Sequence, residues 1–204
     1  GTALIDLDLD SSPDIFMTNG QVDDNIVDLG ELVPYRQPAL VFRNRGDGVF
    51  DNVSGTAGPF FKTRWVGRGM AFGDLDNDGD IDLVINNKDD RPVVLINERL
   101  LPGSARSDAA WIRFVFIGKK SNRSSIGAAA ELTVNGRLVG RQIKGGASYL
   151  SSHDPRLLIG LGQSDRLSDI ALQWPSGASQ VLVGLESRRT YVVREGELPV
   201  VLGD

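Results

Sequence analysis

The stretch GDLDNDGDIDL, residues 73–83, places an aspartate at every second position around a single glycine. A hard divalent cation takes about six to eight oxygen ligands at about 2.3 to 2.6 Å, and alternate residues of a tightly curled loop direct their oxygens to one centre. We therefore predict a calcium loop with side-chain ligands Asp74, Asp76 and Asp78. In this loop Asp80 binds through its backbone carbonyl, and Asp82 is the closing carboxylate.

The residues around this loop predict strands. Gly79 permits a turn that a side chain would obstruct. An EF-hand loop ends in a glutamate at its twelfth position and is flanked by helices, whereas the twelfth position here is Ile85 within a β-branched run. The flanks, residues 67–75 and 81–87, are short, apolar and bounded by glycine or asparagine, so we expect the loop to join two strands.

A second copy of the pattern begins the chain. GTALIDLDLDSSPDIFMTNG, residues 1–20, aligns with the loop region at an offset of 68 residues. The expected ligands of this first loop are Asp6, Asp8, Asp10, Ser12 and Asp14. Ser11 stands in place of the glycine and Pro13 stiffens the exit, so we expect the ligand set to be preserved but the turn to be less relaxed and the ion to bind more weakly.

A hairpin is predicted between the two loops. The segment QPALVFRNRGDGVFDNVSGTAG, residues 37–58, contains two β-rich runs around Arg45, Gly46, Asp47 and Gly48. The RGD tripeptide could indicate integrin binding, but Asp-Gly is a favoured hairpin turn and accounts for it without a receptor.

The second half of the chain predicts a compact β-sandwich. Short strand-like runs at 111–118, 130–136, 137–145, 169–175, 180–185 and 190–196 are separated by Asn-Gly, Gly-Gly and Pro-Ser-Gly turns. The clearest two-residue hairpin signal is Asn135-Gly136. We expect the core of the sandwich to contain three large aromatic side chains, Trp111, Trp174 and Tyr149. An exposed Trp174 could instead stack on a sugar ring.

These motifs together resemble two known families. Both acidic loops and the 37–58 hairpin are similar to the FG-GAP or VCBS repeats of integrin-like β-propellers. The segment from Lys120 to Leu182 resembles the ASPIC/UnbV domain, which follows such repeats in the cartilage acidic protein family. The stretches that carry this second resemblance are Asn122 to Gly127, Gly145 to Leu150, Asp154 to Gly162 and Trp174 to Gly177.

The resemblance implies an all-β chain in two domains. Residues 1–110 would form partial β-propeller blades with calcium loops, and residues 111–204 an ASPIC/UnbV-type β-sandwich. The implied protein is a noncatalytic, calcium-stabilised interaction or adhesion module, secreted to an extracellular or periplasmic location, with an extracellular protein or a glycan as partner. Because fewer than two propeller blades are present, we also expect exposed strand edges that associate with another chain.

Composition narrows the choice of partners. The chain has 204 residues and no cysteine, which excludes disulfides and thiolate metal sites. Bound calcium is therefore the expected crosslink that stabilises the loop-rich blades. Residues 1–110 hold 10 basic and 19 acidic side chains, a net charge of −9, whereas residues 111–204 hold 12 and 8, a net charge of +4. No apolar run approaches the roughly 18 residues of a membrane helix, so no membrane span is expected.

The excess positive charge of the second half is dispersed over apparent strands without an aromatic stacking series, so we expect a solvated sheet face and no nucleic acid. The basic residues concerned are Lys119, Lys120, Arg123, Arg137, Arg141 and Lys144.

An enzyme remains the alternative. Ser151, Ser152, His153 and Asp154 are adjacent in the sequence, but triad members usually come from separate segments and no GxSxG motif surrounds either serine. We expect His153 to be a loop residue that forms hydrogen bonds. The other functions left open are a UnbV-type biosynthetic or metal-dependent enzyme that acts on a small molecule, and a carbohydrate-binding module.

Overall fold

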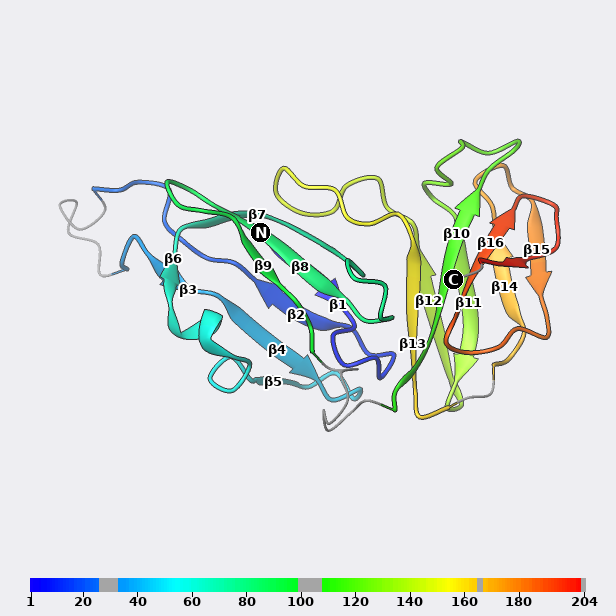
Figure 1. Ribbon diagram of the computed structural model, residues 1–204, viewed down its shortest axis with the longest axis horizontal. Helices are drawn as coiled ribbons and strands as arrows, with labels where there is room; N and C mark the ends of the chain where they lie inside the picture. Colours follow the sequence, from blue (N-terminus) through cyan, green and yellow to red (C-terminus); the bar gives the residue numbers. More distant parts are fainter. Residues whose placement is uncertain (26–32, 99–107, 165–166, 203–204) are drawn as a thin grey trace.

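The computed structural model describes residues 1–25, 33–98, 108–164 and 167–202. It is all-β, with one short 3-10 helix among these residues. Figure 1 shows the strands of the first half at one end of the long axis and those of the second half at the other. This arrangement follows the two hydrophobic clusters, because each half has a core of its own.

Two antiparallel sheets form the first half. One has the order β1-β2-β4-β5, built from Thr2–Ile5, Asp14–Met17, Leu40–Asn44 and Phe50–Asn52. The other has the order β7-β8-β9, built from Gly67–Gly73, Asp82–Asn87 and Val93–Leu95. A two-stranded ribbon, β3 (Gln37–Pro38) with β6 (Arg64–Trp65), and the 3-10 helix η1 (Pro59–Lys62) lie beside them.

The two sheets share one core. Ile5 and Phe16 of the first sheet and Met70 and Ile85 of the second are fully or almost fully buried in the same cluster. Short meandering sheets that pack on one another in this way are blade-like, as expected for a partial β-propeller. Each acidic loop joins the first two strands of its sheet, β1 to β2 and β7 to β8, and the predicted 37–58 hairpin is β4 and β5.

The second half is the predicted β-sandwich. One sheet has the order β13-β10-β16-β17, with strands Leu157–Gly162, Ala110–Ile117, Arg189–Arg194 and Val200–Val201. The other has the order β12-β11-β14-β15, with strands Arg137–Gln142, Ala129–Val134, Ile170–Gln173 and Ser179–Leu182. The β10–β16 pair is parallel and the remaining pairs are antiparallel.

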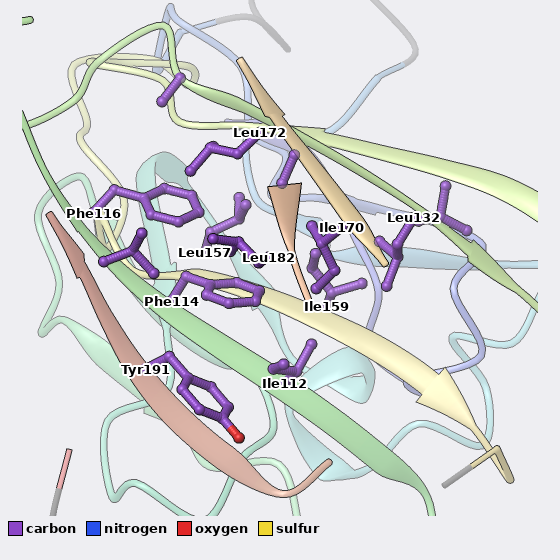
Figure 2. Packing of buried hydrophobic residues seen from close by; sticks show 14 of the residues in the cluster. Ile112, Phe114, Phe116, Leu132, Leu157, Ile159, Ile170, Leu172, Leu182 and Tyr191 are labelled. Atoms are coloured by element: carbon purple, nitrogen blue, oxygen red, sulfur yellow. The ribbon is translucent and has the colours of Figure 1, made fainter. Parts of the chain in front are cut away.

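Alternation along the strands builds the core between the two sheets. Ile112, Phe114 and Phe116 of β10 point into it, as do alternate residues of the facing strands (Figure 2). The β11–β12 hairpin turns at Asn135 and Gly136, both with positive φ (50° and 77°), as the Asn-Gly signal predicts. Strand β13 was missing from the expected strands, although its LLIGLG sequence is apolar throughout.

Candidate functional site

The second acidic loop is held in a tight curl by its own carboxylates. It follows the Gly73–Asp82 pair that ends the β7–β8 ladder. The amide of Gly79 donates to Asp74 Oδ2 (3.0 Å), and the amide of Asp80 donates to Asp78 Oδ1 (3.1 Å). As a result, one carboxylate oxygen from each of the predicted ligands Asp74, Asp76 and Asp78 lies within 4.8 Å of the other two.

The other two predicted ligands lie outside this group of three. Asp82 accepts from the amide of Leu75 (2.8 Å) with one oxygen and from that of Asn97 (2.9 Å) with the other. Its carboxylate therefore ties the start of the loop to the segment after β9. The carboxylate of Asp80 is completely buried, and neither of its oxygens has a hydrogen-bond partner among the described residues.

The first loop repeats this geometry at the offset of 68 residues. Oxygens of Asp6, Asp8 and Asp10 converge within 4.8 Å. The amide of Ser11 donates to Asp6 Oδ2 (3.0 Å) and the amide of Ser12 to Asp10 Oδ1 (2.8 Å).

The exit of the first loop is also held as in the second. Asp14 accepts from the amides of Leu7 (3.1 Å) and Asn44 (2.8 Å), as Asp82 does from those of Leu75 and Asn97. The backbone repeats too, because Leu9 and Asn77 both have positive φ, at 52° and 66°. The two acidic sequences therefore form the same kind of turn.

Arginines contact the first loop from both halves of the chain. Arg43 of β4 donates to Asp8 Oδ2 (2.8 Å). From β12, Arg141 donates to the carbonyl of Ser11 (2.9 Å) and lies 3.9 Å from the Asp6 carboxylate. Arg137 donates to Ser12 Oγ (3.3 Å). The expected solvated sheet face is therefore wrong for Arg141, which is partly buried against the first loop, whereas Arg137 stays exposed although it contacts Ser12.

Two arginines of the second half contact the second loop. Arg113 of β10 forms an ion pair with Asp74, and both side chains are buried. Arg156 donates to the carbonyl of Asp74 and to the side chain of Asn77 (2.7 Å). The Nε of Arg156 also donates to the carboxylate of Asp154 (2.7 Å).

Close backbone contacts bring the sandwich against both loops. A Cβ at Gly79 would lie 2.0 Å from the indole ring of Trp111. On β13, a Cβ at Gly160 would lie 2.5 Å from Leu9 Cα, and the carbonyl of Gly160 accepts from Ser11 Oγ (2.7 Å). Gly160 of β13 thus leaves room for the first loop. The outer face of sheet β13-β10-β16-β17 meets the acidic loops.

The buried carboxylates are reluctant to ionise. Burial, with the charges of neighbouring aspartates added, raises the pKa of Asp80 to about 8. Burial also raises the pKa of Asp6 to about 7, although the guanidinium of Arg141 opposes the shift. The pKa of Asp74 is raised by burial even beside Arg113 and Arg156. Each of these carboxylates therefore favours its neutral form unless a positive charge offsets the cost of burying its ionised form.

The donor set of the second loop fits a hard cation. Asp74 Oδ1 and both carboxylate oxygens of Asp80 are buried without a hydrogen-bond partner among the described residues. Unpaired buried carboxylate oxygens are costly, and oxygen ligands of this kind suit calcium or magnesium rather than a soft metal. The loop has five carboxylates and is contacted by two arginines, whereas the first loop has four carboxylates and is contacted by three.

The Ser151–Asp154 segment contains no hydrogen-bonded relay. Ser151 Oγ donates to the carbonyl of Tyr149 (2.8 Å) and Ser152 Oγ to that of Gly145 (2.9 Å). The ring of His153 stacks on Phe72, with centroids 3.9 Å apart, and its two nitrogens are buried without a partner in the described part of the chain. The expected hydrogen bonds of His153 are therefore wrong.

The three expected aromatic anchors have different surroundings. Trp174 is 2% exposed in the sandwich core, and its Nε1 donates to Gln180 (3.1 Å). Trp111 lies on the opposite face of its sheet, against the second loop. Tyr149 is 56% exposed, so its expected anchoring role is wrong. Trp174 is therefore buried in the core and does not present its ring to a sugar.

The RGD segment forms the predicted turn. Gly46 and Gly48 both have φ of 87°, and Asp47 Oδ1 accepts from the amide of Val49 (3.0 Å). Arg45 is paired with Asp51 on the facing strand. The local hairpin accounts for the tripeptide.

This fold, with two acidic loops between strands of blade-like sheets, is that of a repeat protein of the β-propeller class. Comparison with protein-family models identifies its parts: residues 6–85 match the FG-GAP-like repeat, and residues 118–199 match the ASPIC and UnbV model. The chain thus contains an FG-GAP-like repeat followed by an ASPIC/UnbV domain, in the order that the resemblance implies.

No curated protein matches the chain. Within the described residues, no helix is long and apolar enough to cross a membrane.

Sequence reasoning missed the arginines that contact the loops. Arg113 is the single charged residue in the apolar run WIRFVFIG, and a lone charge in such a strand indicates a buried partner of opposite charge. Arg43 and Arg156 carried no comparable signal, because their partners are distant in the sequence.

Proposed function

We propose that the protein is a noncatalytic, secreted interaction module in which a calcium ion crosslinks the acidic loop 74–82. The observation that carries this proposal is the buried, unpartnered oxygen set of Asp74 and Asp80 beside converging carboxylates of Asp76 and Asp78. A divalent cation would supply the missing partners and oppose the mutual repulsion of the carboxylates. Because the folded loop binds the ion better than the unfolded chain, calcium would raise stability.

The first loop is proposed as the weaker of the two sites. Arg43 and Arg141 already contact carboxylates of this loop, Arg137 contacts the hydroxyl of Ser12, and Ser11 occupies the glycine position with a φ of 74°. The net negative charge that attracts a cation is therefore smaller at the first loop than at the second. A calcium-rich exterior suits loops of moderate affinity, which supports the proposed extracellular or periplasmic location.

Calorimetric titration of chelator-treated protein with calcium tests this proposal. We expect a stronger event that is lost in Asp78→Asn and retained in Asp10→Asn, and a calcium-dependent rise in the thermal midpoint that follows the stronger event. Asp23→Asn is the matched control, because it removes one exposed carboxylate away from both loops. Absence of binding, or binding that survives both loop substitutions, would reject structural calcium.

The interaction role rests on the repeat architecture and on exposed strand edges. Within the described residues β1 pairs only with β2, and β9 only with β8. Each edge strand carries an exposed apolar side chain, Leu4 on β1 and Val94 on β9. Such edges favour pairing with another chain. Light scattering should detect association that Val94→Lys reduces, whereas a concentration-independent monomer would contradict edge pairing.

A small-molecule function is the second candidate. A cavity of about 830 Å³ lies between the two halves and is lined by β1, by residues 72–74 and by residues 153–158. Its lining includes the unpartnered imidazole of His153. Cavities between domains are common ligand sites. Turnover or binding of a small molecule that is lost in His153→Ala, while the fold and calcium binding are retained, would favour this candidate.

A further inference from the structure

The ASPIC/UnbV domain covers the second acidic loop with one strand. Ile112, Phe114 and Phe116 of β10 face the sandwich core, so the alternation of the strand turns Trp111 and Arg113 to the other face. Trp111 lies against Gly79 and Arg113 pairs with Asp74. The loop is encoded in one domain, and part of its surroundings is supplied by the other.

The guanidinium of Arg113 is fixed by three neighbours. It forms the buried ion pair with Asp74, its Nε donates to Thr190 Oγ1 (2.9 Å), and it lies 5.4 Å from the ring centroid of Trp111. Thr190 is itself in β16, the parallel neighbour of β10. The sandwich sheet therefore presents a preoriented positive charge to the first carboxylate of the loop.

A cation in the loop and the guanidinium would act on the same carboxylate. Both are positive and both are attracted to Asp74, and inside a protein such charges interact more strongly than in water. Repulsion between the two positive charges therefore opposes cation binding.

We propose that Arg113 lowers the cation affinity of loop 74–82 and thereby couples cation binding to the docking of the ASPIC/UnbV domain. The inference rests on the proposed function, since it concerns the same loop. Coupling between two binding equilibria is reciprocal, so a cation that is opposed by Arg113 also weakens the docking contacts by the same factor. Cation concentration would then adjust how firmly the two domains are joined.

Terbium luminescence offers a readout specific to this loop. Terbium takes the same oxygen ligands as calcium, and excited indole transfers energy to a nearby bound terbium ion. Trp111 lies against the loop, so we expect terbium emission that Trp111→Phe abolishes. Calcium competition against this signal in an Asp10→Asn protein, in which the first loop has lost a carboxylate, then measures the affinity of loop 74–82.

Arg113→Met is the central variant, because it removes the charge and keeps an apolar side chain of similar length. We expect its calcium affinity to rise at least tenfold. Arg123→Met is the matched control, since Arg123 is exposed on the same domain and should leave the affinity unchanged. Thr190→Val, which frees the guanidinium without removing its charge, should raise the affinity several-fold and serves as the test if Arg113→Met does not fold. Unchanged or weaker affinity in the folded variant would overturn the proposal.

Hydrogen exchange tests the reciprocal effect. The amide of Asp154 donates across the domains to the carbonyl of Phe72 (2.9 Å), so its exchange reports docking. Calcium should speed this exchange in the wild type and should have a smaller effect in Arg113→Met. Equal effects in the two proteins would contradict the coupling.

The possible results separate the two proposals. Equal calcium binding by the wild type and Arg113→Met would reject the coupling and leave the structural calcium site standing. Binding by Arg113→Met alone would reject a calcium site in the wild type and support the inhibitory role of Arg113. Absence of binding by both folded proteins would reject both.

Discussion

Ser11 and Gly79 occupy the same position in the two acidic loops, and both have positive φ, 74° and 98°. Each amide donates to the first aspartate of its loop at 3.0 Å. The loop conformation is therefore set by the carboxylate pattern, even where the residue at the turn is not glycine. Ser11 is strained by this requirement, and its hydroxyl donates to the carbonyl of Gly160 across the domains.

Substitution of Ser11 should separate strain from the hydrogen bond. Ser11→Ala keeps the positive φ and loses the hydroxyl, so it should lower the free energy of unfolding by about 1 kcal/mol. Ser11→Gly loses the same bond but relieves about 1 kcal/mol of strain, so it should be within about 0.5 kcal/mol of the wild type. Chemical denaturation measures both. A Ser11→Ala protein at least as stable as Ser11→Gly would contradict this account.

Gly79→Ala should be more damaging than backbone strain alone explains. The new methyl would lie 2.0 Å from the indole of Trp111, and we expect a loss of about 2 to 4 kcal/mol from strain and overpacking together. Gly48→Ala is the matched control, because its φ is 87° and a Cβ there has no neighbour within 4 Å. Gly48→Ala should lower the free energy of unfolding by about 1 kcal/mol. Equal losses in equilibrium unfolding would show that the domains do not meet at Gly79.

Chelation should make stability depend on pH. Because the pKa of Asp80 in the folded protein is raised to about 8 from 3.8, the folded state binds more protons than the unfolded state between these values. Stability of the calcium-free protein should therefore fall as pH rises through this window. Asp6, with its pKa at about 7, adds to the fall. Bound calcium favours the ionised carboxylates and should reduce the slope.

Thermal midpoints at several pH values, with chelator or with calcium, check this expectation. Asp80→Asn should flatten the slope of the chelated protein. A midpoint that rises with pH in the chelated wild type would contradict it.

Trp174→Ala should destabilise the sandwich. The indole is almost fully buried in the core, and removal of a buried tryptophan side chain costs about 3 to 5 kcal/mol. Tyr149→Ala should change stability by less than about 0.5 kcal/mol, because the ring is exposed. Urea denaturation of both variants tests the contrast. A stable Trp174→Ala protein with reduced glycan binding would favour the carbohydrate-binding alternative.

Protonation of Glu195 should lower the free energy of unfolding at acid pH. Burial opposes its ionisation, but the amides of Lys119, Lys120 and Ser121 and the hydroxyl of Ser176 donate to its carboxylate and lower its pKa to about 2 from 4.5. A carboxylate whose pKa is lower in the folded protein than in the unfolded chain stabilises the fold at pH values above the pKa of the unfolded chain. This contribution is lost as pH falls from about 4.5 to about 2. Glu195→Gln should be less stable at neutral pH and less sensitive over this acid range. Parallel acid-unfolding curves would contradict the role.

The elements that follow local rules were predictable. Alternating aspartates identified both loops and their equivalent positions, the Asn135-Gly136 pair identified its hairpin, and the short apolar runs indicated a sandwich around Trp174. These features depend on residues within a few positions of one another, where turn chemistry and strand alternation dominate. Strand β13 was missed because its glycines weaken the pattern, and Gly160 is explained only by the first loop that lies against it.

By itself the sequence determined the two acidic turns, the order of the two domains and the all-β architecture, since spacing and turn residues encode these locally. Only the tertiary structure decided that Arg113 meets Asp74 and that Arg141 ends at the first loop. It also decided that Tyr149 is exposed, while Trp111 lies against the second acidic turn. The physical reason is that such contacts join residues far apart in the chain, and which face of a strand meets another domain depends on how the completed sheets pack.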